Sequence, residues 1–169
     1  MREENELTDW FREYHNDIYN FLIYYTGGMD VEDLVQETFV KAVRNIHKFK
    51  GEASPRTWLI SIARNVAIDE SRRRRKEETK RNRLLHLSGS AEGADSPEDI
   101  VGLSETKAEL YVAIRTLKQS YYDVLMFRGI NELSVQETAQ ALNWSVNKVN
   151  LSYHRALKAL EKKMGGRKI

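Results

Sequence analysis

Residues 134–160 read SVQETAQALNWSVNKVNLSYHRALKAL and carry the signals of two short helices joined by a tight turn. Ser134 followed by Glu137 is a capping box, in which the hydroxyl and the carboxylate satisfy free N–H groups at a helix start. Asn143 tolerates the left-handed conformation that a sharp turn needs, and Ser145 suits the start of a second helix. The stretch therefore predicts a helix-turn-helix.

The second helix of this motif has an apolar inner stripe and a polar outer face. A period of 3.6 residues places the following residues inward: Val146, Val149, Tyr153, Ala156, Leu157 and Leu160. The same period places the following residues on the outer face: Asn147, Lys148, Asn150, Leu151, His154, Arg155 and Lys158. Such a helix fits the major groove of DNA, where its first turns reach base edges. An ordinary helical hairpin with a solvated basic face is the alternative, and the spacing favours DNA binding.

The rest of the chain shows the same helical periodicity, with only 9 Gly and 2 Pro. An apolar stripe from Leu7 to Tyr25 predicts a helix that ends at Gly27-Gly28. A second stripe predicts a helix that follows Asp30 as N-cap, with these residues inward: Val31, Leu34, Val35, Thr38, Phe39, Ala42, Val43 and Ile46.

Two further helices have recognisable ends. Ser54 as N-cap and Pro55 at the first position open a helix that runs into the basic tract 72–83. A short helix around Leu125 and Phe127 is expected to end at Gly129. The sequence thus predicts an all-α fold.

Charge is distributed unevenly along the chain and suggests two domains. Residues 1–87 carry a net charge of +1, residues 88–105 carry −5, and residues 106–169 carry +6. The acidic segment is rich in Gly, Ser and Pro, which is typical of a flexible linker. We therefore expect two small helical domains, 1–87 and 106–169, joined by an acidic flexible linker over 88–105.

Composition excludes several classes of protein. The chain has no cysteine and only 4 scattered histidines, so we expect no metal site and no cofactor. It has no apolar run long enough for a membrane span, which predicts a cytoplasmic protein without stable membrane insertion. A small hydrolase or metal enzyme is disfavoured because no motif pairs a nucleophile with a base.

A second candidate nucleic-acid site lies in the N-terminal half, where cations, amides and an aromatic ring are close in sequence. The loop supplies Lys48, Phe49 and Lys50, and the following helix supplies Arg64, Asn65, Asp69, Arg72 and Arg73. Aromatic faces stack on unpaired bases and cations hold the backbone, so this group suits single-stranded or melting DNA. The alternatives are that Trp58 at helical spacing is a core residue and that tract 72–76 is a solvated helix end.

Three motifs occur together in one order and cover most of the chain. They are Asp33-Leu-Val-Gln-Glu-Thr-Phe39, then Trp58-Leu-Ile-Ser-Ile-Ala-Arg-Asn65 with Asp69 and Arg72, then Leu133-Ser-Val-Gln-Glu-Thr-Ala139 with His154-Arg-Ala156. In this register the chain resembles the extracytoplasmic-function (ECF) sigma factors of bacteria.

The resemblance implies sigma region 2 in residues 1–87 and sigma region 4 in residues 106–169. It implies that Asp33, Gln36 and Glu37 bind the β′ clamp of core RNA polymerase, and that region 4 touches the β flap. It also implies that the −10 promoter element is bound by these residues: Lys48, Phe49, Lys50, Gly51, Arg64, Asn65, Asp69, Arg72 and Arg73. It implies that the −35 element is bound by Ser145, Asn147, Lys148, Asn150, Leu151 and Arg155. Control by an anti-sigma factor is a further implication.

One departure from the family pattern affects the −35 contacts. Where the family commonly has Gly-Thr-Val-Lys-Ser-Arg, this chain has Asn147-Lys-Val-Asn-Leu-Ser152, which replaces two cations by Asn150 and Ser152. Asn pairs with adenine whereas Arg or Lys favours guanine, so we expect an altered −35 preference. The main alternative function is a stand-alone dimeric helix-turn-helix regulator that binds a two-fold symmetric site without polymerase.

Overall fold

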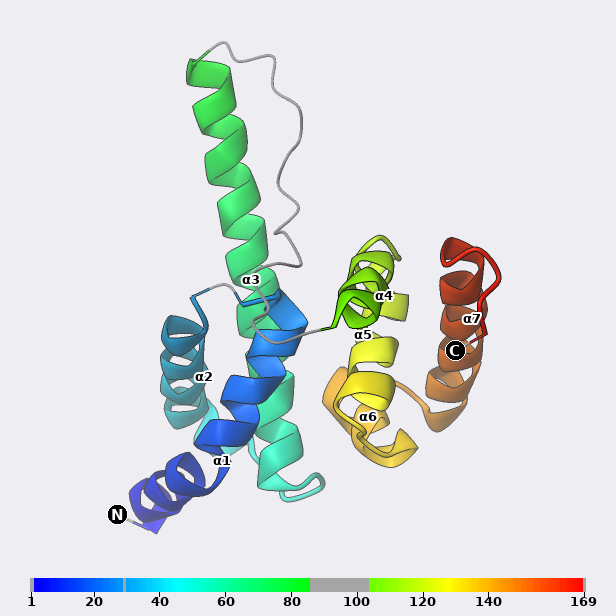
Figure 1. Ribbon diagram of the computed structural model, residues 1–169. Helices are drawn as coiled ribbons and strands as arrows, with labels where there is room; N and C mark the ends of the chain where they lie inside the picture. Colours follow the sequence, from blue (N-terminus) through cyan, green and yellow to red (C-terminus); the bar gives the residue numbers. More distant parts are fainter. Residues whose placement is uncertain (1, 29, 86–103, 169) are drawn as a thin grey trace.

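The computed structural model describes residues 2–28, 30–85 and 104–168, and every regular element within them is helical (Figure 1). The elements are α1 (Arg2–Thr26), α2 (Val31–Asn45), the 3-10 turn η1 (Ile46–Lys48), α3 (Pro55–Leu84), α4 (Glu105–Arg115), α5 (Gln119–Val124), the π-helical segment η3 (Leu125–Ile130), α6 (Val135–Leu142) and α7 (Val146–Lys163). The prediction of an all-α fold is confirmed. Most of the predicted linker 88–105 lies outside the described residues; Ser104 precedes α4 and Glu105 begins it.

Helices α1, α2 and α3 pack against one another and form the first bundle (Figure 1). Its apolar centre contains Ile18, Leu22, Val35 and Ile60, each with at most 1% of its surface exposed. Burying such side chains is the main stabilisation of a small helical domain. Most residues of the predicted inner stripes of the first helices therefore lie in this core, whereas Phe11 and Val43 are exposed.

The ends of these helices largely follow the local signals. Gly27 takes the positive φ of 81° that ends α1, as expected. The Ser54 hydroxyl accepts from the amide of Thr57 at 3.1 Å, with Pro55 in the first turn of α3. Asp30 differs from expectation because its side chain does not cap α2 and instead bonds Arg74 of α3.

Helix α3 continues well beyond the bundle (Figure 1). Its buried residues lie between Thr57 and Ala67, whereas the helix extends to Leu84, which is 81% exposed. The basic tract is therefore a projecting helix. At 1.5 Å rise per residue the part after Ala67 is about 25 Å long.

Helices α4 to α7 with η3 form the second bundle, around Val124, Phe127, Val149 and Leu160. Gly129 does not end the helix there as expected. The helix instead continues as the π-helical segment η3 through Ile130. The side chain of Asn131, directly after it, donates to the Met126 carbonyl at 2.9 Å.

The helix-turn-helix consists of α6 and α7 and shows the predicted local chemistry. The Ser134 amide donates to the Glu137 carboxylate at 2.7 Å, and the Glu137 amide donates to the Ser134 hydroxyl at 3.1 Å. Asn143 ends α6 in the left-handed conformation at φ 56° and ψ 46°. One inward assignment is wrong, because Val146 is 42% exposed.

No helix in the described ranges is long and apolar enough to cross a membrane. Across the same residues, His, Asp and Glu side chains form no group of three that could hold a metal ion.

Candidate nucleic-acid interface

Helix α7 presents the side chains predicted to reach a DNA groove. Asn147, Asn150, Leu151 and Arg155 are all exposed on it, and Leu151 has 51% of its surface open to solvent. An exposed leucine between amides offers an apolar contact of the kind that the thymine methyl group accepts. The exposed edge of α7 therefore combines hydrogen-bonding and apolar groups.

Two other residues assigned to this face also have structural partners. The Ser145 hydroxyl accepts from the Lys148 amide at 3.1 Å and so caps α7. The Lys148 ammonium lies 4.3 Å from the ring centroid of Trp144, in cation–π geometry. Trp144 was not among the predicted residues, and its position one turn before Lys148 is the sequence signal that would have indicated it.

The loop before α3 is anchored by an aromatic cluster. The ring of Phe49 lies 5.0 Å from that of Trp10 and 5.2 Å from that of Trp58, measured between centroids. Phe49 is half-buried, whereas Lys48, Lys50 and Gly51 are exposed. Phe49 and Trp58 therefore hold the loop on the bundle, and the exposed loop residues remain open to a ligand.

On α3, Asn65, Asp69 and Arg72 are exposed and follow one another at steps of four and three residues. This spacing places them along one side of the helix. Lys41 of α2 lies 3.6 Å from the Asp69 carboxylate. The predicted amide, carboxylate and cation thus share a solvent-facing stripe beside α2.

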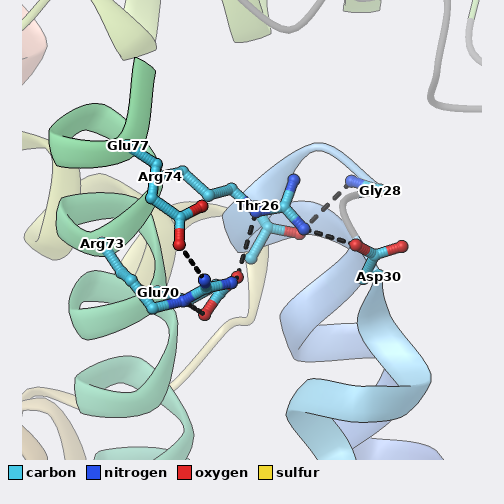
Figure 2. A network of polar contacts seen from close by, with 7 residues as sticks. All are labelled: Thr26, Gly28, Asp30, Glu70, Arg73, Arg74 and Glu77. Atoms are coloured by element: carbon cyan, nitrogen blue, oxygen red, sulfur yellow. Dashed lines mark hydrogen bonds and ion pairs between the residues drawn. The ribbon is translucent and has the colours of Figure 1, made fainter. Parts of the chain in front are cut away.

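Arg73 and Arg74 are held by acidic neighbours on another side of α3 (Figure 2). Arg73 bonds Glu70 at 2.6 Å and Glu77 at 2.7 Å, and Arg74 bonds Glu70 at 3.1 Å and also Asp30. Hydrogen bonding from Arg73, aided by Arg74, lowers the pKa of Glu70 to about 2. Arg73 was expected to face DNA; its side chain is 58% exposed, and its guanidinium already has two carboxylate partners.

Arg64 points toward the second bundle, and its side chain is 25% exposed. Its Nη2 lies 2.6 Å from Oδ2 of Asp123 on α5, and the Asp123 side chain is only 1% exposed. Burial acts to lower the pKa of Arg64, but hydrogen bonding and the charge of Asp123 outweigh it, so the pKa is raised. Nη1 of Arg64 also donates to Oδ1 of Asn65 at 3.1 Å, so Arg64 joins the second bundle to the exposed stripe of α3.

Asp123 also accepts from two further groups. The Tyr25 hydroxyl of α1 donates to Oδ1 at 2.6 Å, and the Gln119 amide donates to the same atom at 3.1 Å. Burial, together with the Asp123 charge and hydrogen bond, raises the pKa of Tyr25. Sequence reasoning missed Asp123 and Tyr25, because no local pattern links residues 98 positions apart.

The face of α2 assigned to a protein partner is open. Asp33, Gln36 and Glu37 are exposed, with Glu37 and Lys41 3.9 Å apart. Val43 was expected to point inward, but it is 56% exposed and lies on the surface of this helix. An acidic surface with an added apolar side chain is suited to a basic protein face.

Both halves of the chain match models of known protein families. The family model described as Sigma-70 region 2 matches residues 10–77, and the model described as Sigma-70, region 4 matches residues 107–160. The chain is 38% identical to the ECF RNA polymerase sigma factor SigX of Bacillus subtilis over 157 residues, which cover 89% of this chain and 79% of SigX. It is 34% identical to the RNA polymerase sigma factor YlaC of the same organism, over 97% of this chain and 95% of YlaC.

Solved structures agree on the fold. The sigma factor RpoE from Bartonella quintana, solved with the anti-sigma factor NepR, matches with a TM-score of 0.67 at 20% identity, over 93% of this chain and 97% of RpoE. CnrH, solved with the cytosolic domain of CnrY, matches with a TM-score of 0.65 at 20% identity, over 96% of this chain and 89% of CnrH. From these matches to both sigma regions and to whole curated relatives, the chain belongs to the ECF family of RNA polymerase sigma factors.

Proposed function

We propose that this chain is a promoter-specificity subunit, which binds core RNA polymerase in the cytoplasm and directs it to promoters with −35 and −10 elements. The observation that carries the proposal is the presence of two separate candidate DNA faces, on α7 and on α3 with its preceding loop, in a chain that matches both sigma regions. The polymerase performs the chemistry, and this subunit contributes binding energy.

The exposed acidic face of α2 supports the assignment of Asp33, Gln36 and Glu37 to the β′ clamp. Exposed carboxylates complement a basic partner and increase the rate of encounter. These three side chains are exposed, so a partner reaches them without rearrangement of the bundle. Region 4 would contact the β flap.

The exposed loop residues Lys48, Lys50 and Gly51, with Asn65, Asp69 and Arg72 of α3, are proposed to capture the displaced strand of the −10 element. Unstacking a base costs a few kcal/mol, and hydrogen bonds in a protein site offset that cost. The aromatic cluster around Phe49 supports this role by fixing the position of the loop.

Helix α7 is proposed to read the −35 element through Asn147, Asn150, Leu151 and Arg155. The two amides suit adenine, and Leu151 suits the thymine methyl group. RpoE was solved with an anti-sigma factor, and we extend to this chain the proposal that such a protein regulates it.

The test is to mix the purified chain with bacterial core RNA polymerase and to measure co-elution and transcription from a library of genomic fragments. Co-elution with defined start sites supports the proposal. Failure to bind polymerase, under conditions in which another sigma factor binds, would contradict it. Specific duplex binding to a symmetric site without polymerase would favour a stand-alone regulator instead.

A further inference from the structure

The turn of the helix-turn-helix carries a tryptophan that is fixed at both its backbone and its ring. The Trp144 amide donates to the Ala139 carbonyl at 2.9 Å, directly after Asn143 in its left-handed conformation. The Trp144 ring is half-buried and packs against the buried apolar core. The ring is therefore held in one place immediately before α7.

Lys148 is held at both ends of its side chain. Its backbone amide donates to the Ser145 hydroxyl at 3.1 Å, which fixes the residue in the first turn of α7. Its ammonium lies 4.3 Å from the centroid of the Trp144 ring, in cation–π geometry. Since Trp144 precedes α7, the charge lies toward the N-terminal end of this helix, and Asn150 and Leu151 follow further along it.

The Lys148 ammonium remains able to bind an anion. Lys148 is exposed, and among the residues that the structure describes it pairs with no carboxylate. A cation–π contact attracts the charge through the ring face and leaves N–H donors on the other side of the ammonium. Arg73 differs, because two carboxylates already bond its guanidinium. Lys148 is thus a positioned cation without a counter-charge.

The positive charge on the first turns of α7 depends on this residue. Within residues 146–154, Lys148 is the only lysine or arginine, and Asn150 and Ser152 stand where the family commonly has cations. Phosphate contacts position a protein on duplex DNA, whereas contacts to base edges specify the sequence. Asn147 and Asn150 offer amides to base edges, so Lys148 is left to supply the phosphate contact of these turns.

The position of the ammonium favours a phosphate over a base. The sugar–phosphate backbone borders the major groove, and base edges line its floor. A lysine reaches guanine by extending into the groove, which would require the ammonium of Lys148 to leave the Trp144 ring. A phosphate at the edge of the groove requires no such movement, and a side chain that is already ordered loses less conformational entropy on binding.

We propose that Trp144 is a positioning residue for the −35 element, which holds the Lys148 ammonium as a contact to a DNA phosphate at the N-terminal end of α7. This inference rests on the proposed function and extends it to a residue outside the predicted site. The Trp144–Lys148 pair contributes affinity and register on the duplex, and the choice of bases rests with the other exposed residues of α7.

Salt dependence tests the phosphate contact. K148M removes the charge and keeps the length of the side chain, and K162M makes the same change at the exposed C-terminal end of α7. Between about 50 and 200 mM salt, the affinity of wild-type holoenzyme for a duplex promoter fragment from the genomic library should fall about 3.5-fold more than that of K148M holoenzyme, the effect of one phosphate contact. K162M should follow the wild type. Equal salt dependence of K148M and the wild type would overturn the proposal.

A double-mutant cycle tests the role of Trp144. W144L removes the aromatic face and retains an apolar side chain, and should weaken promoter binding about threefold by freeing the Lys148 side chain. In the K148M background the same change should have no further effect, because no ammonium remains to be held. W144F keeps a weaker ring and should give a smaller loss, again absent in the K148M background, which provides the cycle if W144L does not fold. Equal losses in both backgrounds would overturn the proposal, because they would indicate packing alone.

Binding-site selection separates a phosphate contact from a base contact. K148M holoenzyme should select the same −35 bases as the wild type, and a changed base would overturn the proposal by showing that Lys148 reads sequence. If the wild-type chain does not bind polymerase, the proposed function fails and this inference fails with it. Normal polymerase binding with an unchanged salt dependence in K148M refutes this inference alone.

Discussion

The guanidinium of Arg73 lies 2.6 Å from the carboxylate of Glu70, one turn earlier on α3, whereas neighbouring Arg72 makes no ion pair with any described residue. Two adjacent arginines of a basic tract thus have different surroundings. A side chain already bonded to two carboxylates has less to gain from a phosphate, because the existing bonds must first be broken.

This difference predicts unequal effects on DNA binding. Arg72→Ala should weaken binding of the holoenzyme to promoter DNA and reduce the slope of log affinity against log salt by roughly 0.7 to 0.9. Arg73→Ala should change that slope little. Fluorescence anisotropy over a range of salt concentrations measures both, and equal slopes for the two variants would contradict the distinction.

The pKa of Glu70 predicts a pH-dependent contribution to stability. Hydrogen bonding from Arg73 lowers this pKa from 4.5 to about 2, so the contribution is present above pH 4.5 and is lost as the pH falls toward 2. Glu70→Gln should lower the free energy of unfolding by about 1 kcal/mol at pH 7, after allowance for solvent screening. Urea unfolding at several pH values should show this difference shrinking with acid. Glu78→Gln is the control, and a difference independent of pH would refute the assignment.

The open face of α2 predicts a selective loss of polymerase binding. Asp33→Ala combined with Gln36→Ala should weaken affinity for core RNA polymerase by about tenfold, because charges at a protein interface steer and hold the partner. The melting temperature should stay nearly constant, since both side chains are exposed. Titration of labelled protein with core polymerase measures the effect, with Glu78→Ala as control. Unchanged affinity would remove this face from the interface.

Asn150 predicts the base preference of α7. Binding-site selection with the holoenzyme should return adenine where Asn150 reaches the groove, and Asn150→Lys should shift the selected base toward guanine, with about 1–3 kcal/mol of discrimination. Lys158→Ala should instead weaken binding equally for all sequences. A selection that returns the usual −35 motif of the family from the wild-type chain would show that Asn150 does not set the preference.

The capping box of α6 predicts a local stability effect. Ser134→Ala removes a side-chain oxygen that accepts from the Glu137 amide at 3.1 Å, and should cost about 1 kcal/mol in free energy of unfolding. Ser104 also precedes a helix, but its side chain makes no capping bond, so Ser104→Ala should be nearly neutral. Thermal unfolding of the two variants measures the contrast, and matching losses would contradict it.

Local signals were sufficient for most helix ends and for most of the exposed side of α7, with Gly129 and Val146 as exceptions. A capping hydroxyl and its amide partner lie within three residues of each other, so Ser54, Ser134 and Ser145 could be assigned from sequence alone. Contacts between distant segments could not. Asp30 bonds Arg74 across 44 residues instead of capping α2, and Asp123 reaches Arg64 across 59 residues. Periodicity indicated a helix at Val43 but gave no means of telling an apolar core side chain from one on an open face.

The length of α3 has a consequence for where region 4 is able to act. Since the last buried residue of the helix is Ala67 and the helix continues to Leu84, the connection to region 4 starts at the tip of a rigid arm, about 25 Å from the first bundle. The arm thus adds its own length to the reach of the segment that connects it to region 4. Removing one turn of the helix would shorten that reach by about 5 Å.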